Sequence, residues 1–160
     1  MTNIVVTIEK LIKIRNQLKK ENKKVVFTNG VFDLIHAGHV DYLCKAKLLG
    51  DVLIVAVNSD KSVKRIKGSN RPITNQKERT FVLANLRPVD YVIVFEEDTP
   101  LKIIEKLVPD ILVKGADWSK DKIVGKEIVE ANGGKVETIK FVHQQSTTNI
   151  INTILEKFKK

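Results

Sequence analysis

The sequence predicts a doubly wound α/β fold, in which a five-stranded parallel sheet carries helices on both faces. Short apolar, β-branched runs alternate with amphipathic segments from one end of the chain to the other. The intervening segments are long enough for the right-handed crossovers that join parallel strands. The run Val52–Val57 is apolar at every position, as expected of a strand that is buried on both faces. These observations predict one Rossmann-like domain over residues 1–160.

Each element is expected from its own pattern, in chain order. Residues 1–22 contain an amphipathic lead-in helix, at about residues 7–20. The candidate strands are Lys24–Asn29, Val52–Asn58, Tyr91–Phe95, Ile111–Lys114 and Lys135–Ile139. Helices are expected between them at about 39–49, 75–86, 100–107 and 122–131, with a closing helix at 147–158. Asp98-Thr99-Pro100 is typical of a helix start, and Asn132-Gly133-Gly134 of a helix end.

The composition excludes several classes of protein. Hydrophobic residues make up 42% of the 160 residues, which is enough for a core and argues against disorder. The single cysteine, Cys44, excludes an internal disulfide framework and favours a reducing compartment. The longest apolar run, Val52–Val57, is far shorter than the ~20 residues of a membrane helix, and no apolar leader is present. We therefore expect a cytoplasmic protein with no membrane partner.

The chain is basic, with 28 Lys and Arg residues against 19 Asp and Glu residues and a net charge of +9. Such a charge predicts an anionic partner. A doubly wound sheet binds ligands at the carboxyl ends of its strands, where the strand order reverses. Three segments with unusual side chains follow predicted strand ends: Thr28–His39, Ser59–Arg71 and Lys114–Trp118. We expect them to form the binding edge.

The first segment ends in His36-Ala37-Gly38-His39, at the start of a predicted helix. The free N–H groups and the dipole of a helix N-terminus favour an anion, and two imidazoles on one face add donors for a phosphate. Gly38 lets a phosphate or a base come close to the backbone. Two alternatives stay open: ordinary polar residues at a helix start, or a zinc site that would need Cys44 or His143 as a third ligand.

The second segment has five basic residues and one acid between Asp60 and Arg71, and we expect a loop that folds over a ligand. The alternative is a solvated charge run. Arg79, in the following helix, either joins this loop or forms a surface pair with Glu78. Lys47 occupies an otherwise apolar helix face, where it either extends to solvent or supplies a point charge to a reacting phosphate.

The third segment holds the only tryptophan, Trp118, which packs either in the core or against a ligand. Ser146-Thr147-Thr148 precedes the closing helix, as a phosphate cradle or as a plain N-cap cluster. The sequence has no P-loop, no Gly-x-Gly-x-x-Gly after a strand, no Gly-x-Ser-x-Gly and no His-Glu-x-x-His. These absences argue against P-loop kinases, dinucleotide oxidoreductases, serine hydrolases and metalloproteases.

Together these segments resemble the nucleotidyltransferase superfamily defined by the His-x-Gly-His signature, and most closely the D-glycero-β-D-manno-heptose 1-phosphate adenylyltransferases. The resemblance runs from about Lys24 to Leu155. The stretches that carry it are Thr28–Asp33, Ile54–Asp60, Phe95–Pro100, Leu112–Gly115 and Ser146–Ile151. The run Phe141–Gln145 departs from the Arg-Thr-x-Gly-Ile landmark of glycerol-phosphate cytidylyltransferases. This departure argues against that branch and leaves open a phosphate contact for His143.

The resemblance implies transfer of the adenylyl group of ATP to the sugar 1-phosphate, which gives ADP-heptose and pyrophosphate. It implies catalytic roles for His36, His39 and Lys47. The residues that it implies for nucleotide or substrate binding are Thr28, Asn29, Gly30, Phe32, Asp33, Gly38, Asn58, Asp60, Lys64, Lys67, Arg71, Arg79, Lys114, Gly115, Asp117, Trp118, Ser146, Thr147 and Thr148. Mg²⁺ is expected with ATP, held mostly by the nucleotide and water, with no metal site of protein side chains.

The partners that the resemblance implies are ATP, the sugar 1-phosphate, a second copy in a homodimer, and a separate heptose kinase upstream in lipopolysaccharide core biosynthesis. Two other functions stay open. One is cytidylyl transfer to glycerol 3-phosphate or another small phosphate. The other is a basic nucleic-acid-binding domain, supported by the net charge and the cluster at 61–71. Because the basic residues gather at strand ends and aromatic residues are few, we expect no nucleic-acid partner.

Overall fold

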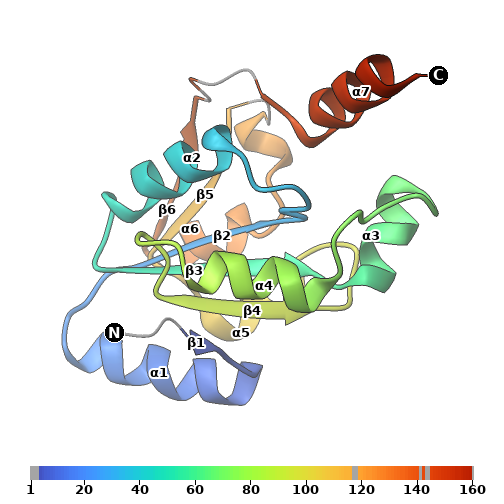
Figure 1. Cartoon of the computed structure of the whole chain (residues 1–160). Helices are drawn as coiled ribbons and strands as arrows, with labels where there is room; N and C mark the ends of the chain where they lie inside the picture. The colour runs from blue at the N-terminus through green and yellow to red at the C-terminus, as the bar shows by residue number, and fades with distance from the viewer. Residues whose placement is uncertain (1–3, 117–118, 141, 143–144, 160) are drawn as a thin grey trace.

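The computed structural model describes residues 4–116, 119–140, 142 and 145–159, and over these residues the sheet is parallel with strand order β1-β4-β3-β2-β5-β6 (Figure 1). The strands are β1 (Ile4–Val5), β2 (Val25–Gly30), β3 (Val52–Asn58), β4 (Tyr91–Phe95), β5 (Ile111–Gly115) and β6 (Lys135–Ile139). The predicted fold class and its five strands are confirmed. The short edge strand β1 was not predicted, because two residues are too few to show a period.

Helices cover both faces of this sheet (Figure 1). They are α1 (Ile8–Lys20), α2 (Ala37–Lys47), α3 (Asp60–Lys67), α4 (Gln76–Ala84), α5 (Leu101–Leu107), α6 (Lys126–Ala131) and α7 (Thr147–Phe158), with a 3₁₀ turn, η1, at Lys120–Lys122. Successive residues of β3 alternate between two cores. Ile54 and Ala56 pack with side chains of α1, α5 and α6, whereas Leu53 and Val55 pack with side chains of α2 and α4. The continuous apolar run is therefore buried on both faces, as predicted.

The prediction of a loop after β3 is wrong, because residues Asp60–Lys67 form the helix α3. The Ser59 side chain caps this helix by accepting a hydrogen bond from the N–H of Ser62. Asp60 lies in the first turn and Lys64, Arg65 and Lys67 in the last, an order that complements the helix dipole. The same basic residues that suggested a solvated loop thus stabilise a short helix.

The strand order reverses beside β2, which lies between β3 and β5. The carboxyl ends of these strands therefore face the crevice in which doubly wound sheets bind ligands. The helix α2 begins at this edge and leads back to the amino end of β3 (Figure 1). In the part of the chain that the structure describes, no helix is both long and apolar enough to cross a membrane.

Candidate active site

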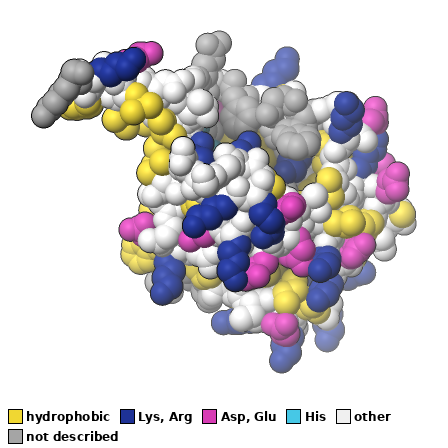
Figure 2. Space-filling model, turned by 90° about the vertical axis from the view of Figure 1, so that its right-hand side faces the viewer, with side chains coloured by type: hydrophobic (Ala, Val, Ile, Leu, Met, Phe, Trp, Pro, Cys, Tyr) yellow, Lys and Arg dark blue, Asp and Glu magenta, His cyan; other side chains and the backbone are white. Residues whose placement is uncertain are grey.

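A cavity of about 610 Å³ lies at the carboxyl ends of β2, β3, β4 and β5. Figure 2 views this edge of the sheet and shows Lys and Arg side chains gathered on it, with Asp and Glu side chains between them. The predicted site residues that line the cavity are Asn29, Gly30, Phe32, Asp33, His39, Asn58, Lys67, Arg71, Lys114, Ser146 and Thr147. The structure thus brings together residues from three segments that the sequence singled out, and from the start of α7.

The turn after β2 has a strained backbone. Phe32 has a φ of +50°, a left-handed conformation that a bulky side chain rarely adopts. Its ring lies over Gly30, where an added Cβ would approach the ring to 3.0 Å. The ring centroid also lies 5.3 Å from that of His39. Strain of this kind is retained where a loop must hold a defined shape, and here it places an aromatic ring against a cavity-lining histidine.

His36 and His39 stack on each other, with ring centroids 3.9 Å apart and planes inclined by 26°. His36 is the N-cap residue of α2 and makes no side-chain capping bond. Burial, and secondarily the neighbouring His36, lower the pKa of His39 to about 4, against a smaller opposing effect of the Leu34 backbone. Burial also lowers the pKa of His36. Both shifts favour the neutral form of the imidazole at pH 7.

Three buried polar atoms at this site have no hydrogen-bond partner among the residues that the structure describes: Nδ1 of His36, Nδ1 of His39 and Oδ1 of Asn29. Buried polar atoms normally find partners, and the exceptions mark a role outside the fold. The two residues that line the cavity, His39 and Asn29, come from α2 and from the end of β2. The two histidines belong to the N-cap and first turn of α2, where backbone N–H groups favour an anion.

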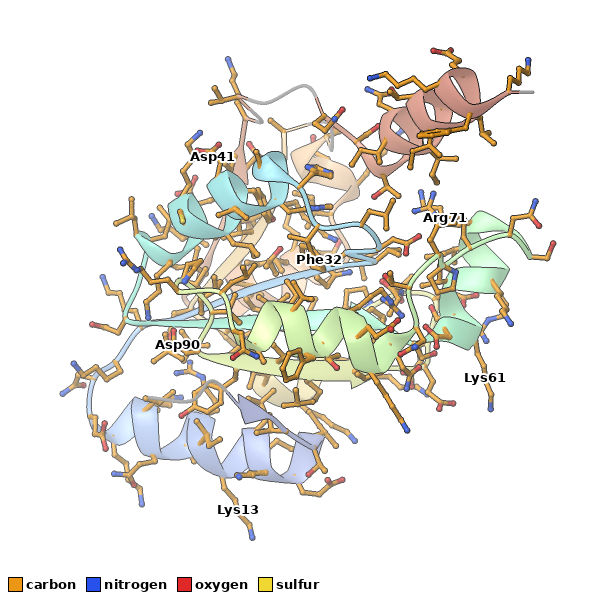
Figure 3. The ribbon with its side chains drawn as sticks, viewed as in Figure 1. Lys13, Phe32, Asp41, Lys61, Arg71 and Asp90 are labelled. Atoms are coloured by element: carbon orange, nitrogen blue, oxygen red, sulfur yellow. The ribbon has the colours of Figure 1, made fainter. Side chains whose placement is uncertain are left out.

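Asp33 is a buried anchor, with its side chain 1% exposed. It accepts hydrogen bonds from the N–H of Ile73 at 2.9 Å, the N–H of Thr74 at 3.0 Å and Nε of Arg71 at 2.6 Å. Burial opposes ionisation of Asp33, but the Thr74 and Ile73 N–H groups and Arg71 outweigh burial and lower its pKa. The ion pair fixes Arg71 at the cavity, and Figure 3 shows Arg71 on the same side of the molecule as Phe32.

Arg79 holds the loops around the cavity and does not line it. Its buried guanidinium donates to the carbonyl oxygens of Val31, Asn58 and Thr74, and to Oδ1 of Asp60 at 2.7 Å. These contacts join the turn after β2, the end of β3, the start of α3 and the segment before α4. Arg79 and Asp60, predicted as binding residues, are instead part of the scaffold in this structure.

The prediction that Lys47 lies near the reacting phosphates is wrong. Lys47 ends α2, whose 11 residues rise about 15 Å from the cavity edge. Its Nζ donates to Oδ2 of Asp90 at 2.5 Å and to the carbonyl oxygen of Asp51, just before β4 and β3. Figure 3 shows Asp90 at the end of the sheet opposite Phe32 and Arg71. The first residues of α2 border the cavity, whereas Lys47 lies at the far end of the same helix.

The remaining predicted residues differ in whether they line the cavity. Thr28 is buried and shares a hydrogen bond of 2.7 Å with the Tyr42 hydroxyl. Lys114 lines the cavity, and its Nζ donates to the Asn29 carbonyl oxygen at 3.3 Å. Together with Lys47, the described predicted residues that do not line it are Thr28, His36, Gly38, Asp60, Lys64, Arg79, Gly115 and Thr148. Asp117, Trp118 and His143 lie outside the described residues.

Several lining residues were missed: Val31, Ile66, Asp98, Thr99, Pro100 and Val124. Asp98, Thr99 and Pro100 follow the carboxyl end of β4, so the rule that singled out the other segments applies to them as well. Ile66 was missed because its segment was expected to be a loop. No group of three or more His, Cys, Asp or Glu side chains is placed to hold a metal ion within the described ranges.

The chain is similar to known proteins in sequence and in fold. The family model described as cytidylyltransferase-like matches residues 27–155. The bifunctional protein HldE of Citrifermentans bemidjiense is 58% identical over 136 residues, which are 85% of this chain and 28% of that protein. The chain therefore spans less than a third of the length of this relative.

Two solved structures share the fold. The lipopolysaccharide core biosynthesis protein from Thermoplasma volcanium has a TM-score of 0.63 and 30% identity, with 77% of this chain and 99% of that chain covered. The pantoate-beta-alanine ligase from Francisella tularensis, in a complex with beta-gamma ATP and beta-alanine, has a TM-score of 0.63, with all of this chain and 80% of that chain covered. At 18% identity, this second likeness concerns the fold alone.

Proposed function

Because the chain belongs to the cytidylyltransferase-like family of nucleotidyltransferases, we propose that it transfers the adenylyl group of ATP to D-glycero-β-D-manno-heptose 1-phosphate. An oxygen of the sugar 1-phosphate attacks the α-phosphorus of ATP. The bond between that phosphorus and the oxygen leading to the β-phosphorus breaks, and pyrophosphate leaves. The products are ADP-heptose and pyrophosphate.

The observation that carries the proposal is the pair of neutral, stacked imidazoles with unpaired Nδ1 atoms at the start of α2. The attacking phosphate is already anionic, so the site needs no strong base. It needs in-line placement of the two substrates and hydrogen bonds to the charge that develops on the phosphates. Buried donors fixed in place before the reaction supply such bonds at little reorganisation cost.

The lining residues divide into roles according to their position. His39, with His36 stacked behind it, lies against the α- and β-phosphate oxygens. Ser146 and Thr147, at the N-terminus of the 12-residue helix α7, cradle the β- and γ-phosphates. Lys67 and Arg71 close over the substrates from α3 and the segment that follows it. Each of these residues borders the same cavity, except His36, which reaches it through His39.

We propose that Mg²⁺ binds together with the triphosphate of ATP. The cavity carboxylates do not form an oxygen-ligand set of their own, because Asp33 is taken up by N–H donors and Asp98 is the one other carboxylate among the described lining residues. When bound, the ion neutralises part of the phosphate charge, with the nucleotide and water as its main ligands. No role of a protein side chain in this proposal depends on it.

The heptose assignment draws on the relatives, which are named bifunctional protein HldE, and on the lipopolysaccharide core biosynthesis protein. We propose that a heptose kinase acts upstream of this transfer in lipopolysaccharide core biosynthesis. A homodimer and a cytoplasmic location complete the proposal.

The test is a grid of pyrophosphate-release assays. ATP, CTP and GTP are each paired with the heptose 1-phosphate and with glycerol 3-phosphate. We expect the highest kcat/KM for ATP with the heptose 1-phosphate. A preference for CTP with glycerol 3-phosphate would favour the cytidylyltransferase alternative. Absence of release from every pair, together with tight and steeply salt-dependent binding of DNA or RNA, would favour a nucleic-acid-binding domain instead.

A further inference from the structure

We propose that Asp98 is a specificity-determining residue that accepts hydrogen bonds from hydroxyl groups of the acceptor sugar. The inference rests on the proposed function. It adds a residue that distinguishes a sugar phosphate with several hydroxyl groups from a smaller phosphate ester. It starts from the charges that line the cavity. Of the described lining residues, only Asp33 and Asp98 carry carboxylates, among the cations Lys67, Arg71 and Lys114.

The two carboxylates are not equivalent. The Asp33 side chain is 1% exposed, and both of its oxygens accept hydrogen bonds from the chain. The Asp98 side chain is 52% exposed, and within the described ranges its one ion pair, with Nε of Arg65 at 2.8 Å, uses Oδ1. The second oxygen of Asp98 is therefore left for a ligand in the cavity. Asp33 has no acceptor to offer.

The position of Asp98 separates it from the phosphate-binding groups. It follows β4, which lies two strands from β2 and three strands from β5. At 4.8 Å per strand, β4 lies about 10 Å from β2, which leads into the turn that bears the histidines. It lies about 14 Å from β5, which bears Lys114. A carboxylate repels phosphate oxygens but accepts hydrogen bonds from neutral hydroxyls. The β4 side of the cavity thus suits the uncharged part of the acceptor.

The segment that bears Asp98 is held in place by two residues of α3. Arg65 of α3 donates to Asp98 and to the Glu96 carbonyl oxygen. Ser62 donates to the Glu97 carbonyl oxygen at 2.8 Å and accepts from Nδ2 of Asn58 at 3.0 Å. The carboxylate is therefore oriented before the ligand arrives. An ion pair as exposed as Arg65–Asp98 adds little stability, so stability alone is a weak reason for its placement.

The experiment compares Asp98→Ala and Asp98→Asn with the matched control Glu97→Gln. Glu97 is the adjacent carboxylate, paired with Lys102 at 2.9 Å, and it does not line the cavity. For each variant, we would measure KM for ATP, KM for the heptose 1-phosphate, and the inhibition constant of methyl phosphate, which has no hydroxyl group. We expect Asp98→Ala to raise the acceptor KM about 10- to 100-fold, with a smaller rise for Asp98→Asn.

The KM for ATP and the methyl phosphate constant should stay within about twofold of the unaltered chain, because neither probes the hydroxyl subsite. Glu97→Gln should change none of the three constants. An unchanged acceptor KM in both Asp98 variants would overturn the inference while leaving the proposed function intact. So would an equal loss toward ATP and methyl phosphate. If the unaltered chain transferred no nucleotide to any sugar 1-phosphate, the proposed function would fail and this inference with it.

Discussion

Two groups of polar residues lie at the same edge of the sheet and differ in how their hydrogen bonds are used. Asp33 and Arg79 are buried, and their side chains make hydrogen bonds to the backbone of the surrounding loops. His36, His39 and Asn29 are partly buried, and each keeps a polar atom that has no hydrogen-bond partner in the described part of the chain. The first group holds the loops, and the second is left for a ligand. Residue type alone does not separate them, whereas a hydrogen-bond census does.

The comparison is tested most severely at Arg79. Arg79→Met would leave the Asp60 carboxylate and three carbonyl oxygens without their donor, and we expect a loss of about 3–5 kcal/mol in the free energy of unfolding. Urea denaturation measures it. Arg87→Ala, at an exposed position, is the control and should stay within about 0.5 kcal/mol. A fully stable Arg79→Met protein would show that this network is not the scaffold.

His39→Ala tests the other group. We expect kcat to fall by about 10²–10³, because one preorganised donor to the phosphates is lost. The midpoint of thermal unfolding should change little, since His39 Nδ1 has no hydrogen-bond partner among the described residues whose loss would destabilise the fold. The readouts are pyrophosphate release and a melting curve on the same sample. Full activity of this variant would remove His39 from the proposed mechanism.

The pH dependence of stability sharpens the comparison. The folded pKa of His39, about 4, lies below the ordinary value of 6.5, so the unfolded chain takes up a proton first as the pH falls. We therefore expect His39 to lower the stability as the pH drops from 6.5 toward 4. Denaturant titrations between pH 7.5 and pH 4.5 measure the slope, and His39→Gln should flatten it. If the stability of the His39→Gln variant fell more steeply with falling pH than that of the unaltered chain, a buried, neutral His39 would be contradicted.

Lys47→Ala should have the smallest effect. The Lys47–Asp90 ion pair is about a third exposed on both sides, so we expect its loss to cost ~1 kcal/mol or less of stability. Because Lys47 lies at the opposite edge of the sheet, kcat should stay within about twofold of the unaltered chain. A 10²-fold loss of kcat with normal stability would return Lys47 to the active site.

Most of the fold could be predicted because its signals are local. Strands β3, β4 and β6 have the predicted bounds. β3 and β4 are short apolar runs between polar segments, and β6 follows the helix-ending residues Asn132-Gly133-Gly134. The closing helix α7 also matches, with Ser146 as its cap. The misses have physical causes. The basic run after β3 was expected to be a loop, but its charge order favours a helix, and β1 is too short to show a pattern.

The candidate site likewise has a part that could be predicted from local sequence and a part that could not. The segments that border the cavity could be predicted, because parallel strands bring their carboxyl ends to one edge and the residues that follow them are fixed by the sequence. Which side chains in those segments face the cavity could not. Lys47 and Arg79 depend on where a helix carries a side chain after several turns, and on which carbonyl oxygens from distant loops meet it.

By itself, the sequence determined the sheet, the binding edge and the His-x-Gly-His turn, because these follow from hydrophobic period and neighbouring residues. Only the tertiary structure decided that Asp33 and Arg79 are scaffold, that Lys47 is remote, and that Asp98 shares a cavity with His39. The physical reason is that a buried polar group is assigned by its partners. Those partners come from segments about 20 to 50 residues away in the chain for Arg79, and their meeting is a property of the fold alone.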